Sequence, residues 1–240
     1  VGDKSYLHAV DGINMKVYPG ETIGVVGESG CGKSTLGRTI LRLIEPTSGQ
    51  ILYNGEDITK LNARQMKRMR QEMQIIFQDP YASLDPRKSV IEIIAEYMII
   101  NKTLPTKREI YNRAAHLMDV VGLARRYATA YPHELDGGRR QRIGIARALS
   151  VNPKFIVCDE PVSALDVSIQ AQILNLLMDL QDEMGLTYMF VTHDLSVVKH
   201  ISNNIVVMYL GQCLEFASSD ELFASPLHLP PGGHDLMAAA

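Results

Sequence analysis

A glycine-rich stretch near the N-terminus has the residue types and the spacing of a phosphate-binding loop. Residues 27–34 spell GESGCGKS, a full match to the pattern G-x-x-x-x-G-K-[ST]. The glycines allow successive backbone N–H groups to turn toward an anion, and a helix that begins near Lys33 adds the positive end of its dipole. Lys33 can bind the β- and γ-phosphates of a nucleotide, and the Ser34 hydroxyl can ligate Mg²⁺. The stretch therefore predicts a nucleoside triphosphate site.

The residues on either side of this loop fit the strand and the helix that it requires. Residues 23–26 are apolar and rich in β-branched side chains, which favours a short buried strand. After the loop, Leu36, Ile40, Leu41 and Ile44 recur at helical spacing. The alternative interpretation is a glycine-rich turn that contains a lysine by chance. The strand before the loop and the helix after it argue against that alternative.

Two adjacent acids follow another apolar strand, more than one hundred residues further along the chain. Residues 155–158 are apolar, and Asp159 and Glu160 come directly after them. A phosphate-binding enzyme needs a carboxylate at such a strand end to hold Mg²⁺, directly or through water. The second acid can polarise the attacking water as a general base. Alone, the pair would indicate only a solvated turn; together with the phosphate-binding loop, it predicts Mg²⁺ binding by Asp159 and base catalysis by Glu160.

Composition and charge narrow the class of protein. The 240 residues are 46% hydrophobic and 21% charged, with a net charge of −3. This is typical of a soluble globular protein of one large domain, and it lacks the basic excess that would indicate nucleic acid as a partner. Cys31, Cys158 and Cys213 have no paired spacing, so we expect a reduced, cytosolic setting. No apolar run reaches the ~18 residues of a membrane span, and no signal peptide is recognisable.

The order of the remaining patterns predicts an α/β fold with a helical insertion. In the first part of the chain we expect a strand pair over 4–21, short strands over 50–53 and 73–77, and a basic helix over 62–72. From residue 81 to about 152 the pattern is helical, which predicts a helical subdomain inserted into the sheet domain.

Strand and helix patterns then alternate again toward the C-terminal end. The expected elements are a strand over 155–158, a helix over 168–184, a strand over 187–191, a hairpin from strands 205–209 and 213–216, and a short helix over 219–223. We expect residues 229–240, which contain two prolines and a run of alanines, to be a weakly ordered tail.

Five stretches, in order, make the chain resemble the ATP-binding-cassette (ABC) ATPases over residues 4–228. They are the Walker A motif GESGCGKST, Gln78 at the Q-loop position, the Walker B motif FIVCDE, SALD at the D-loop position (residues 163–166), and His193 at the switch-histidine position. Residues 77–87, 133–149 and 225–228 resemble more closely the oligopeptide/dipeptide importer branch, which includes nickel importers.

The resemblance implies a fold and a role for each matching residue. The fold is an α/β P-loop NTPase (RecA-like) core with an N-terminal antiparallel β-subdomain and the inserted helical subdomain. The implied catalytic residues are Glu160, His193 and Gln78. The implied ligands of Mg²⁺ are Ser34, Gln78 and Asp159. The residues expected to bind ATP or to line the site between two subunits are Gly27, Ser29, Gly30, Cys31, Gly32, Lys33, Ser34, Thr35, Asp136, Gly137, Gly138 and Asp166.

Tyr6 is the one early aromatic residue placed to stack on the nucleotide base. An ordinary surface or strand tyrosine is an equally good interpretation of this residue.

The signature motif of the family is altered in this chain. The family sequence is Leu-Ser-Gly-Gly-Gln, whereas residues 135–139 are LDGGR. Asp136 can cap the following helix, but it cannot donate a hydrogen bond to a γ-phosphate as the family's serine does. A like-charge pair at ~4 Å costs roughly 4 kcal/mol at an effective dielectric near 20, and Arg139 offsets part of that cost. A tolerated natural variant, a degenerate composite site and an engineered change all remain open.

The function that the resemblance implies is that of an ATP-hydrolysing subunit of a peptide importer. Such subunits work as head-to-tail dimers, use ATP and Mg²⁺, and bind permease subunits at the cytoplasmic side of the cell membrane; nucleic acid is not expected as a partner. Residues 81–87 are the segment expected to meet the permease. One alternative is a regulatory subunit that binds ATP with little turnover, and another is a cassette ATPase outside transport. Homodimer or heterodimer, and peptide or nickel as cargo, stay open.

Overall fold

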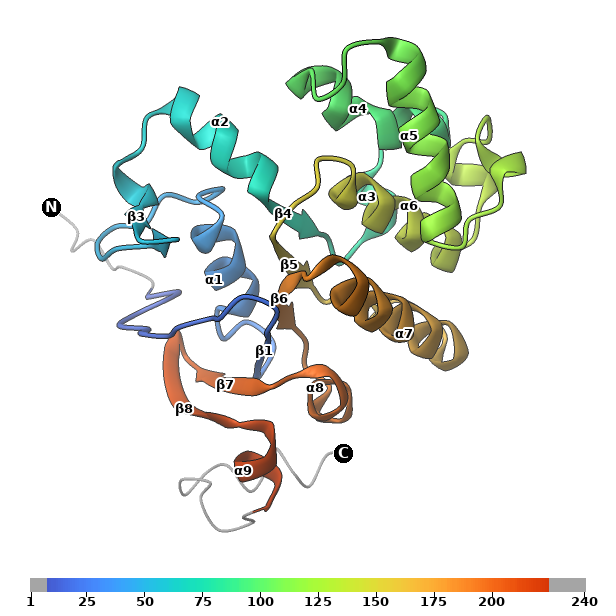
Figure 1. Ribbon diagram of the computed structural model, residues 1–240. Coiled ribbons are helices and arrows are strands. Elements are labelled where there is room, and N and C mark those ends of the chain that lie inside the picture. The colour runs from blue at the N-terminus through green and yellow to red at the C-terminus, as the bar shows by residue number, and fades with distance from the viewer. Residues whose placement is uncertain (1–7, 225–240) are drawn as a thin grey trace, which may run out of the picture.

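A six-stranded sheet runs through the middle of residues 8–224, which are the residues that this computed structural model describes (Figure 1). The strand order is β4-β5-β6-β1-β7-β8. The strands from β4 to β7 in that order run parallel, and β8 pairs antiparallel with β7. Their bounds are β1 (Thr22–Gly27), β4 (Met73–Ile76), β5 (Phe155–Asp159), β6 (Thr187–Val191), β7 (Asn204–Tyr209) and β8 (Gln212–Ser218).

Strand β1 lies between β6 and β7, and all of its residues are buried. Ile23 is in register with Met189 on one side and with Asn204 on the other. Apolar residues fill this strand because helices cover both faces of a parallel sheet. The loop that follows β1 therefore leaves from the middle of the sheet. The expected strands at the P-loop, at the two acids and before His193 are confirmed.

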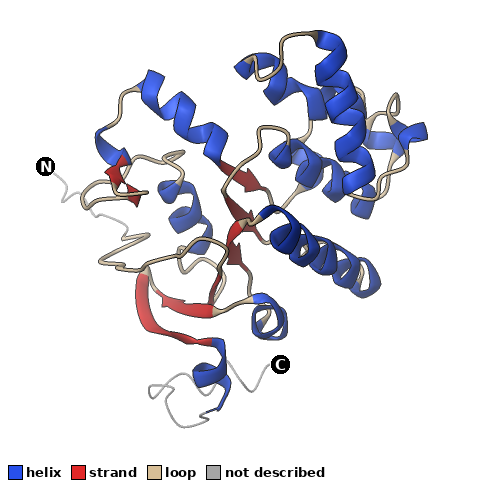
Figure 2. Cartoon of the chain, viewed as in Figure 1, coloured by secondary structure: helices blue, strands red, loops and turns tan. Residues whose placement is uncertain are grey.

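Helices cover both faces of the sheet (Figure 2). Helices α1 (Lys33–Ile40) and α2 (Ala63–Glu72) lie on one side, and α6 (Gly137–Leu149), α7 (Val167–Met184) and α8 (Leu195–Ile201) lie on the other. Alternate residues of β5 follow this division. Val157 packs in the cluster that contains Leu36 of α1, whereas Ile156 and Cys158 pack in the cluster of α6 and α7. The predicted α/β P-loop fold is confirmed.

A group of helices between β4 and β5 packs around its own apolar residues. Its members are α3 (Pro80–Ser83), α4 (Val90–Asn101), α5 (Lys107–Val120), α6 and the short 3₁₀ turns η2 (Arg125–Tyr127) and η3 (Pro132–Glu134). Ile94, Met98, Leu117 and Ile143 are buried at its centre. Thr106 and Glu109 form a capping box that begins α5. The helices that we predicted within residues 81–152 are thus present.

The first part of the chain differs from the prediction. In the described residues of the expected pair over 4–21, which are residues 8–21, no strand forms. Val10, Ile13, Met15 and Val17 do turn toward the core, as their alternation indicates, but the Asp11 N–H donates to the Gly211 carbonyl instead of to a neighbouring strand (2.7 Å). The antiparallel pair in this half of the chain is β2 (Leu52–Tyr53) with β3 (Glu56–Asp57), followed by the 3₁₀ turn η1 (Ile58–Lys60).

Two other differences concern helices. Helix α1 ends at Ile40, so Ile44 is not part of it and is 42% exposed. The short helices α3 and α8 were not predicted, because each has too few residues to show a periodic pattern; each begins at an aspartate that caps it, Asp79 and Asp194. The hairpin of β7 and β8 and the helix α9 (Ser219–Ala224) are confirmed.

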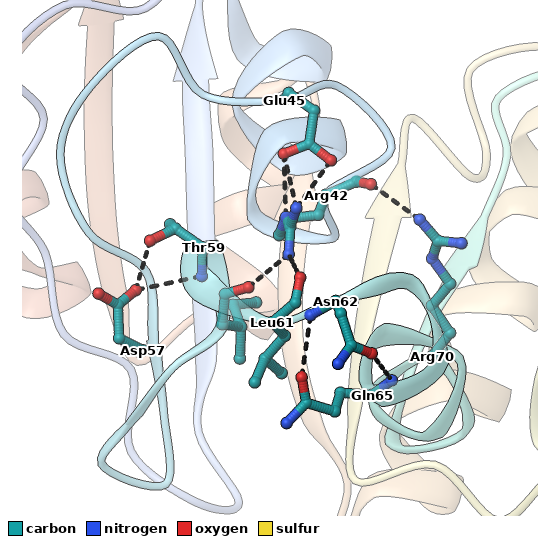
Figure 3. Close-up of polar contacts among 9 residues, drawn as sticks. Arg42, Glu45, Asp57, Thr59, Leu61, Asn62, Gln65 and Arg70 are labelled. Atoms are coloured by element: carbon teal, nitrogen blue, oxygen red, sulfur yellow. Dashed lines mark hydrogen bonds and ion pairs between the residues drawn. The ribbon is translucent and has the colours of Figure 1, made fainter.

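One arginine ties the end of α1 to the loop that follows it (Figure 3). Arg42 has a positive φ of 48°, which turns the chain away from the helix axis. Its Nη1 donates to the carbonyls of Ile58 (2.7 Å) and Leu61 (2.9 Å), and its Nη2 pairs with Glu45 (2.8 Å). Arg70 of α2 donates to the Arg42 carbonyl (3.0 Å). These bonds hold η1 and α2 against the C-terminal end of α1, the end opposite the P-loop.

No helix in residues 8–224 combines the length and the apolar character needed to cross a membrane.

The packing of α1 on β5 can be tested with one methyl group. A Cβ at Gly37 of α1 would lie 2.8 Å from Val157 Cγ1, so we expect Gly37→Ala to destabilise the protein by about 1–3 kcal/mol. Gly144 of α6 is the matched control, because a Cβ there meets nothing within 4 Å. We expect Gly144→Ala to stabilise by up to about 1 kcal/mol through helix propensity. Urea denaturation measures both, and equal effects of the two variants would contradict this packing.

Candidate nucleotide site

The loop between β1 and α1 fits its surroundings only because two of its residues lack side chains. Gly27 and Gly32 have φ values of 151° and 106°. A Cβ on Gly27 would collide with the Met208 carbonyl oxygen of β7, and a Cβ on Gly32 would collide with the Ala9 carbonyl oxygen. The loop is thus held between the sheet and the N-terminal segment. This packing fixes the backbone N–H groups that would face a phosphate.

Lys33 points into the loop that it follows. The residue is 5% exposed, and its Nζ donates to the carbonyl oxygens of Gly27 (2.7 Å) and Glu28 (2.8 Å). Cys31 is buried beside it, with its Sγ 3.9 Å from Nζ. Phosphate oxygens offer the ammonium group the same kind of partner as these carbonyls. Lys33 is therefore already at the place where a phosphate would enter.

The other predicted loop residues differ in their exposure. Ser29 and Gly30 form the exposed tip of the loop, and Thr35 is half-buried in the first turn of α1.

Asp159 lies at the end of β5, opposite the first turn of α1. It is 1% exposed, and its two carboxylate oxygens have different partners. The Ser34 hydroxyl donates to Oδ1 (2.6 Å), and Arg38 Nη2 pairs with Oδ2 (3.3 Å). Burial raises the pKa of the neighbouring Cys158 thiol, and the Asp159 charge adds to that rise, so the thiol stays neutral. Two oxygen groups of the kind that Mg²⁺ binds, a hydroxyl and a carboxylate, thus meet at the P-loop.

The Glu160 carboxylate contacts two side chains that follow the ends of other strands. Its Oε2 accepts a hydrogen bond from Gln78 Nε2 (2.9 Å) and lies 3.5 Å from His193 Nδ1. Glu160 has a positive φ of 47°, a conformation that is uncommon outside glycine, and its N–H donates to the Val191 carbonyl (2.9 Å). This turn points the Glu160 side chain away from Asp159 and toward Gln78 and His193. The predicted catalytic residues Glu160, His193 and Gln78 are therefore brought together.

The altered signature begins helix α6. Asp136 is the N-cap: its Oδ1 accepts from the Arg139 N–H (2.8 Å), and its Oδ2 pairs with Arg139 Nη1. The Arg139 guanidinium also lies 4.9 Å from the centre of the Tyr127 ring, and Arg126 lies 5.1 Å from the same ring. These residues and Gly138 line a hollow of about 290 Å³. The carboxylate of Asp136 is thus neutralised by its own helix.

The signature and the D-loop lie apart from the P-loop of their own chain. Within residues 8–224, no hydrogen bond or ion pair joins Asp136, Gly137, Gly138 or Asp166 to the P-loop or to Glu160. Helix α6 belongs to the group of helices on the other side of the sheet from α1 (Figure 1). Asp166 is exposed at the start of α7, beside Val167, which is 82% exposed. Tyr6 lies outside the described residues.

Arg38 is a functional candidate that the motif search missed. It lies four residues after Ser34, so both side chains lie on the same face of α1, the face turned to Asp159. The signal in the sequence was a basic residue four positions after the P-loop serine, a spacing that places both side chains on one face of a helix. No motif pattern includes it, so it was passed over.

The fold and this set of residues define a P-loop nucleotide-binding protein. A family model described as "ABC transporter" matches residues 10–163. The oligopeptide transport ATP-binding protein OppF of Bacillus subtilis is 55% identical over 229 residues, which cover 95% of this chain and 75% of that protein. AppF of the same organism, also an oligopeptide transport ATP-binding protein, is 53% identical over 95% of this chain and 68% of its own length.

Solved structures agree with this assignment. The dimeric ATP-binding cassette MJ0796, in a post-hydrolysis state bound to ADP and Pi, has a TM-score of 0.82 at 29% identity, covering 91% of this chain and 94% of that one. CbiO1 of Clostridium perfringens, part of the transporter complex cbiONQ, has a TM-score of 0.81 at 31% identity, covering 95% of this chain and 92% of that one. The chain belongs to the ABC transporter family, as an ATP-binding ATPase domain of that family.

The pair of Arg38 with the buried Asp159 can be tested in the nucleotide-free protein. Arg38→Gln leaves one Asp159 oxygen without its cation, and because Arg38 is partly exposed we expect a loss of about 1–2 kcal/mol in the free energy of unfolding. Arg64→Gln on α2 is the control, because Arg64 is exposed and its removal should change stability by less than ~0.5 kcal/mol. The measurement is urea denaturation. Equal stabilities of the two variants would mean that the pair contributes nothing.

Proposed function

We propose that this chain is the ATP-hydrolysing subunit that powers peptide import across the cytoplasmic membrane as part of an ABC transporter. The names of OppF and AppF, at 55% and 53% identity, supply the cargo class. The observation that carries the catalytic part is the convergence on Glu160 of Gln78 and His193 beside the Ser34–Asp159 pair.

Each residue has a chemical task in this proposal. Lys33 exchanges its loop carbonyls for the β- and γ-phosphates. Ser34 and Asp159 would hold Mg²⁺. Both side chains present oxygen atoms, and Mg²⁺ usually takes one or two protein oxygens alongside phosphates and water. When bound, the ion neutralises charge that develops on the phosphates.

The three remaining residues act on the water and the reaction products. Glu160 accepts the proton of the attacking water, since its carboxylate is only partly exposed and lies next to two groups that can share the charge. Gln78 orients Glu160 or the water through its side-chain amide, and His193 contacts the γ-phosphate.

A second ATPase subunit completes the site in this proposal. Asp136, Gly138 and Asp166 lie away from the P-loop of their own chain, and the solved cassette MJ0796 is a dimer. In a head-to-tail pair, the start of α6 of one subunit would face the P-loop of the other. Permease subunits would hold the pair at the cytoplasmic side of the membrane, and the exposed Tyr81, in the segment that follows Gln78, is placed to meet them.

Turnover and nucleotide binding separate the catalytic proposal from simple ATP binding. We expect Glu160→Gln to lower the steady-state ATPase rate by about 10²-fold or more, the contribution of a general base, while the affinity for ATP is kept. Glu183→Gln, at an exposed glutamate of α7, is the control and should keep the parent rate. ATPase assays and equilibrium nucleotide binding measure the two quantities. Parent-level turnover by Glu160→Gln would overturn the role of Glu160 as base.

The Asp136–Arg139 pair predicts a dependence of one substitution on the other. We expect Arg139→Gln to weaken ATP-dependent association of two subunits by about tenfold or more, because it leaves the Asp136 charge uncompensated near the partner's phosphates. The double variant Asp136→Ser with Arg139→Gln should regain the lost affinity. Arg126→Gln is the control, because Arg126 stacks on the same tyrosine but does not pair with Asp136.

Sedimentation of four variants at two salt concentrations gives the required measurement: Arg139→Gln, the single Asp136→Ser, the double variant and the Arg126→Gln control. A strictly additive effect of the two substitutions would show that Arg139 does not compensate Asp136. It would favour the regulatory subunit with a degenerate site, the alternative to the function proposed here.

A further inference from the structure

One cation is buried where α6 ends. Arg147 is 7% exposed and lies in the last turn of the helix. Among the described residues, no carboxylate forms an ion pair with it; its partners are the Ser83 carbonyl oxygen, 2.6 Å from Nη1, and the rings of Tyr97 and Phe77, at 5.8 and 6.0 Å. Desolvation lowers the pKa of the Arg147 guanidinium, although the group stays charged at neutral pH. The Glu96 charge acts on the guanidinium without forming an ion pair. A buried cation without a directly paired carboxylate is a costly group to keep.

The partners of Arg147 lie on both sides of Gln78 in the sequence. Phe77 directly precedes Gln78, and Ser83 is the last residue of α3, the short helix that follows it. The carbonyl at the end of α3 has no partner within its own helix, and the guanidinium supplies one. Arg147 therefore fixes the two ends of residues 77–83, the segment that presents the Gln78 amide to Glu160.

A second arginine of α6 contacts the same segment. The Arg140 guanidinium lies 5.0 Å from the centre of the Tyr81 ring, and its Nε donates to the Pro132 carbonyl (2.9 Å). Arg140 and Arg147 are seven positions apart, so they lie on one face of the helix. The 13 residues of α6 span ~20 Å, and the helix carries Asp136 and Gly137 at its other end. Residues 77–83 are thus attached to the helix that begins with the signature.

We propose that Arg147 is a positioning residue that couples the Gln78 segment to the signature helix, so that a displacement of residues 77–83 moves the start of α6. This role rests on the function proposed above, in which Gln78 responds to the nucleotide. Without Arg147, only the contact of Arg140 with Tyr81 would link the segment to the helix, and the main-chain attachment at Ser83 would be lost. The chain of contacts runs from Glu160 through Gln78 to residues 77–83, then through Arg147 to α6.

A purely structural role explains less of this arrangement. An exposed lysine or arginine in the last turn would satisfy the helix dipole without burial. An apolar side chain of similar size would fill the space among Phe77, Tyr97 and α6 at a lower cost in desolvation. Neither alternative can donate a hydrogen bond to a main-chain carbonyl from a rigid planar group that also stacks on two rings.

Hydrogen exchange of the full chain, with and without AMPPNP and Mg²⁺, tests the coupling. In the parent protein we expect the nucleotide to slow exchange in residues 27–35 and to change exchange in both 77–83 and 133–139. In Arg147→Met, we expect exchange of 77–83 without nucleotide to rise about tenfold or more, the factor of one lost charged hydrogen bond, and the response of 133–139 to disappear. Protection of residues 27–35 should remain.

Arg142 supplies the matched control on the same helix. Its Nη1 donates to the Val121 carbonyl (2.6 Å) and its Nη2 to Gln172 (3.3 Å), so it too bonds a carbonyl, but among the described residues it forms no hydrogen bond or ion pair with residues 77–83. Because its charge acts on Asp136, the comparison uses the change that the nucleotide causes in 133–139 and not the exchange of that segment in the free protein. Arg142→Met should keep the responses of both segments. If Arg147→Met does not fold, Arg147→Lys and Arg142→Lys are compared in the same way, because lysine keeps the charge but not the fork.

The outcomes separate this inference from the proposed function. The coupling is wrong if folded Arg147→Met keeps the paired responses of 77–83 and 133–139, or if the parent protects 27–35 while 133–139 does not respond. Failure of the parent to protect 27–35 would overturn the proposed function instead. In that case, hydrogen exchange of residues 77–83 without nucleotide still tests whether Arg147 attaches this segment to α6. The attachment is disproved if residues 77–83 exchange at the same rate in Arg147→Met and in Arg142→Met.

Discussion

The buried carboxylate of Asp159 is the group on which the site depends. A charge that is 1% exposed needs partners for both oxygens, and here they come from one turn of one helix, Ser34 and Arg38. Helix α1 can present both only if the P-loop brings it directly above the end of β5. That placement in turn requires β1 in the middle of the sheet and a loop without side chains at Gly27 and Gly32. The position of the sheet, the glycines of the loop and the meeting of the Ser34 and Asp159 oxygens thus follow from one constraint.

Glu160 meets the opposite demand one residue later. In the proposed function its carboxylate has to stay accessible to water. The chain reverses direction at Glu160 through a left-handed conformation immediately after the buried strand. The cost of that conformation is offset by the backbone bond to Val191 and by contacts from the ends of two other strands. The two adjacent carboxylates therefore occupy a closed and a more open position, so that under the proposed function neither acid could take the role of the other.

The sequence predicts those parts of the molecule that depend on local patterns. The P-loop, its flanking strand, the acids at the end of β5 and the helical character of residues 81–152 are set by neighbouring residues and could be located without coordinates. Residues 8–21 could not, because their alternation resembles a strand while their backbone bonds go to the distant Gly211. Arg38 was missed because no motif includes it and its partner is 121 residues away. The resemblance implied that Gln78 is catalytic and binds Mg²⁺; its contact with Glu160 was not predicted, because that contact depends on the sheet order.

In the altered signature, the effect of the Asp136 charge depends on which groups surround it and not on the number of charges in the motif. An exposed pair such as Asp136 and Arg139 contributes little to the free energy of unfolding, since water screens both partners. In the proposed head-to-tail dimer its effect would change as the triphosphate of another subunit approaches, because desolvation between two protein surfaces strengthens each remaining interaction. A lone carboxylate would then repel the nucleotide, whereas a carboxylate already bonded to the N–H and the guanidinium of Arg139 presents a nearly neutral helix start. The two departures from the family motif, three residues apart on one helix turn, are therefore best understood as one change that leaves the net charge of the signature as it is in the family.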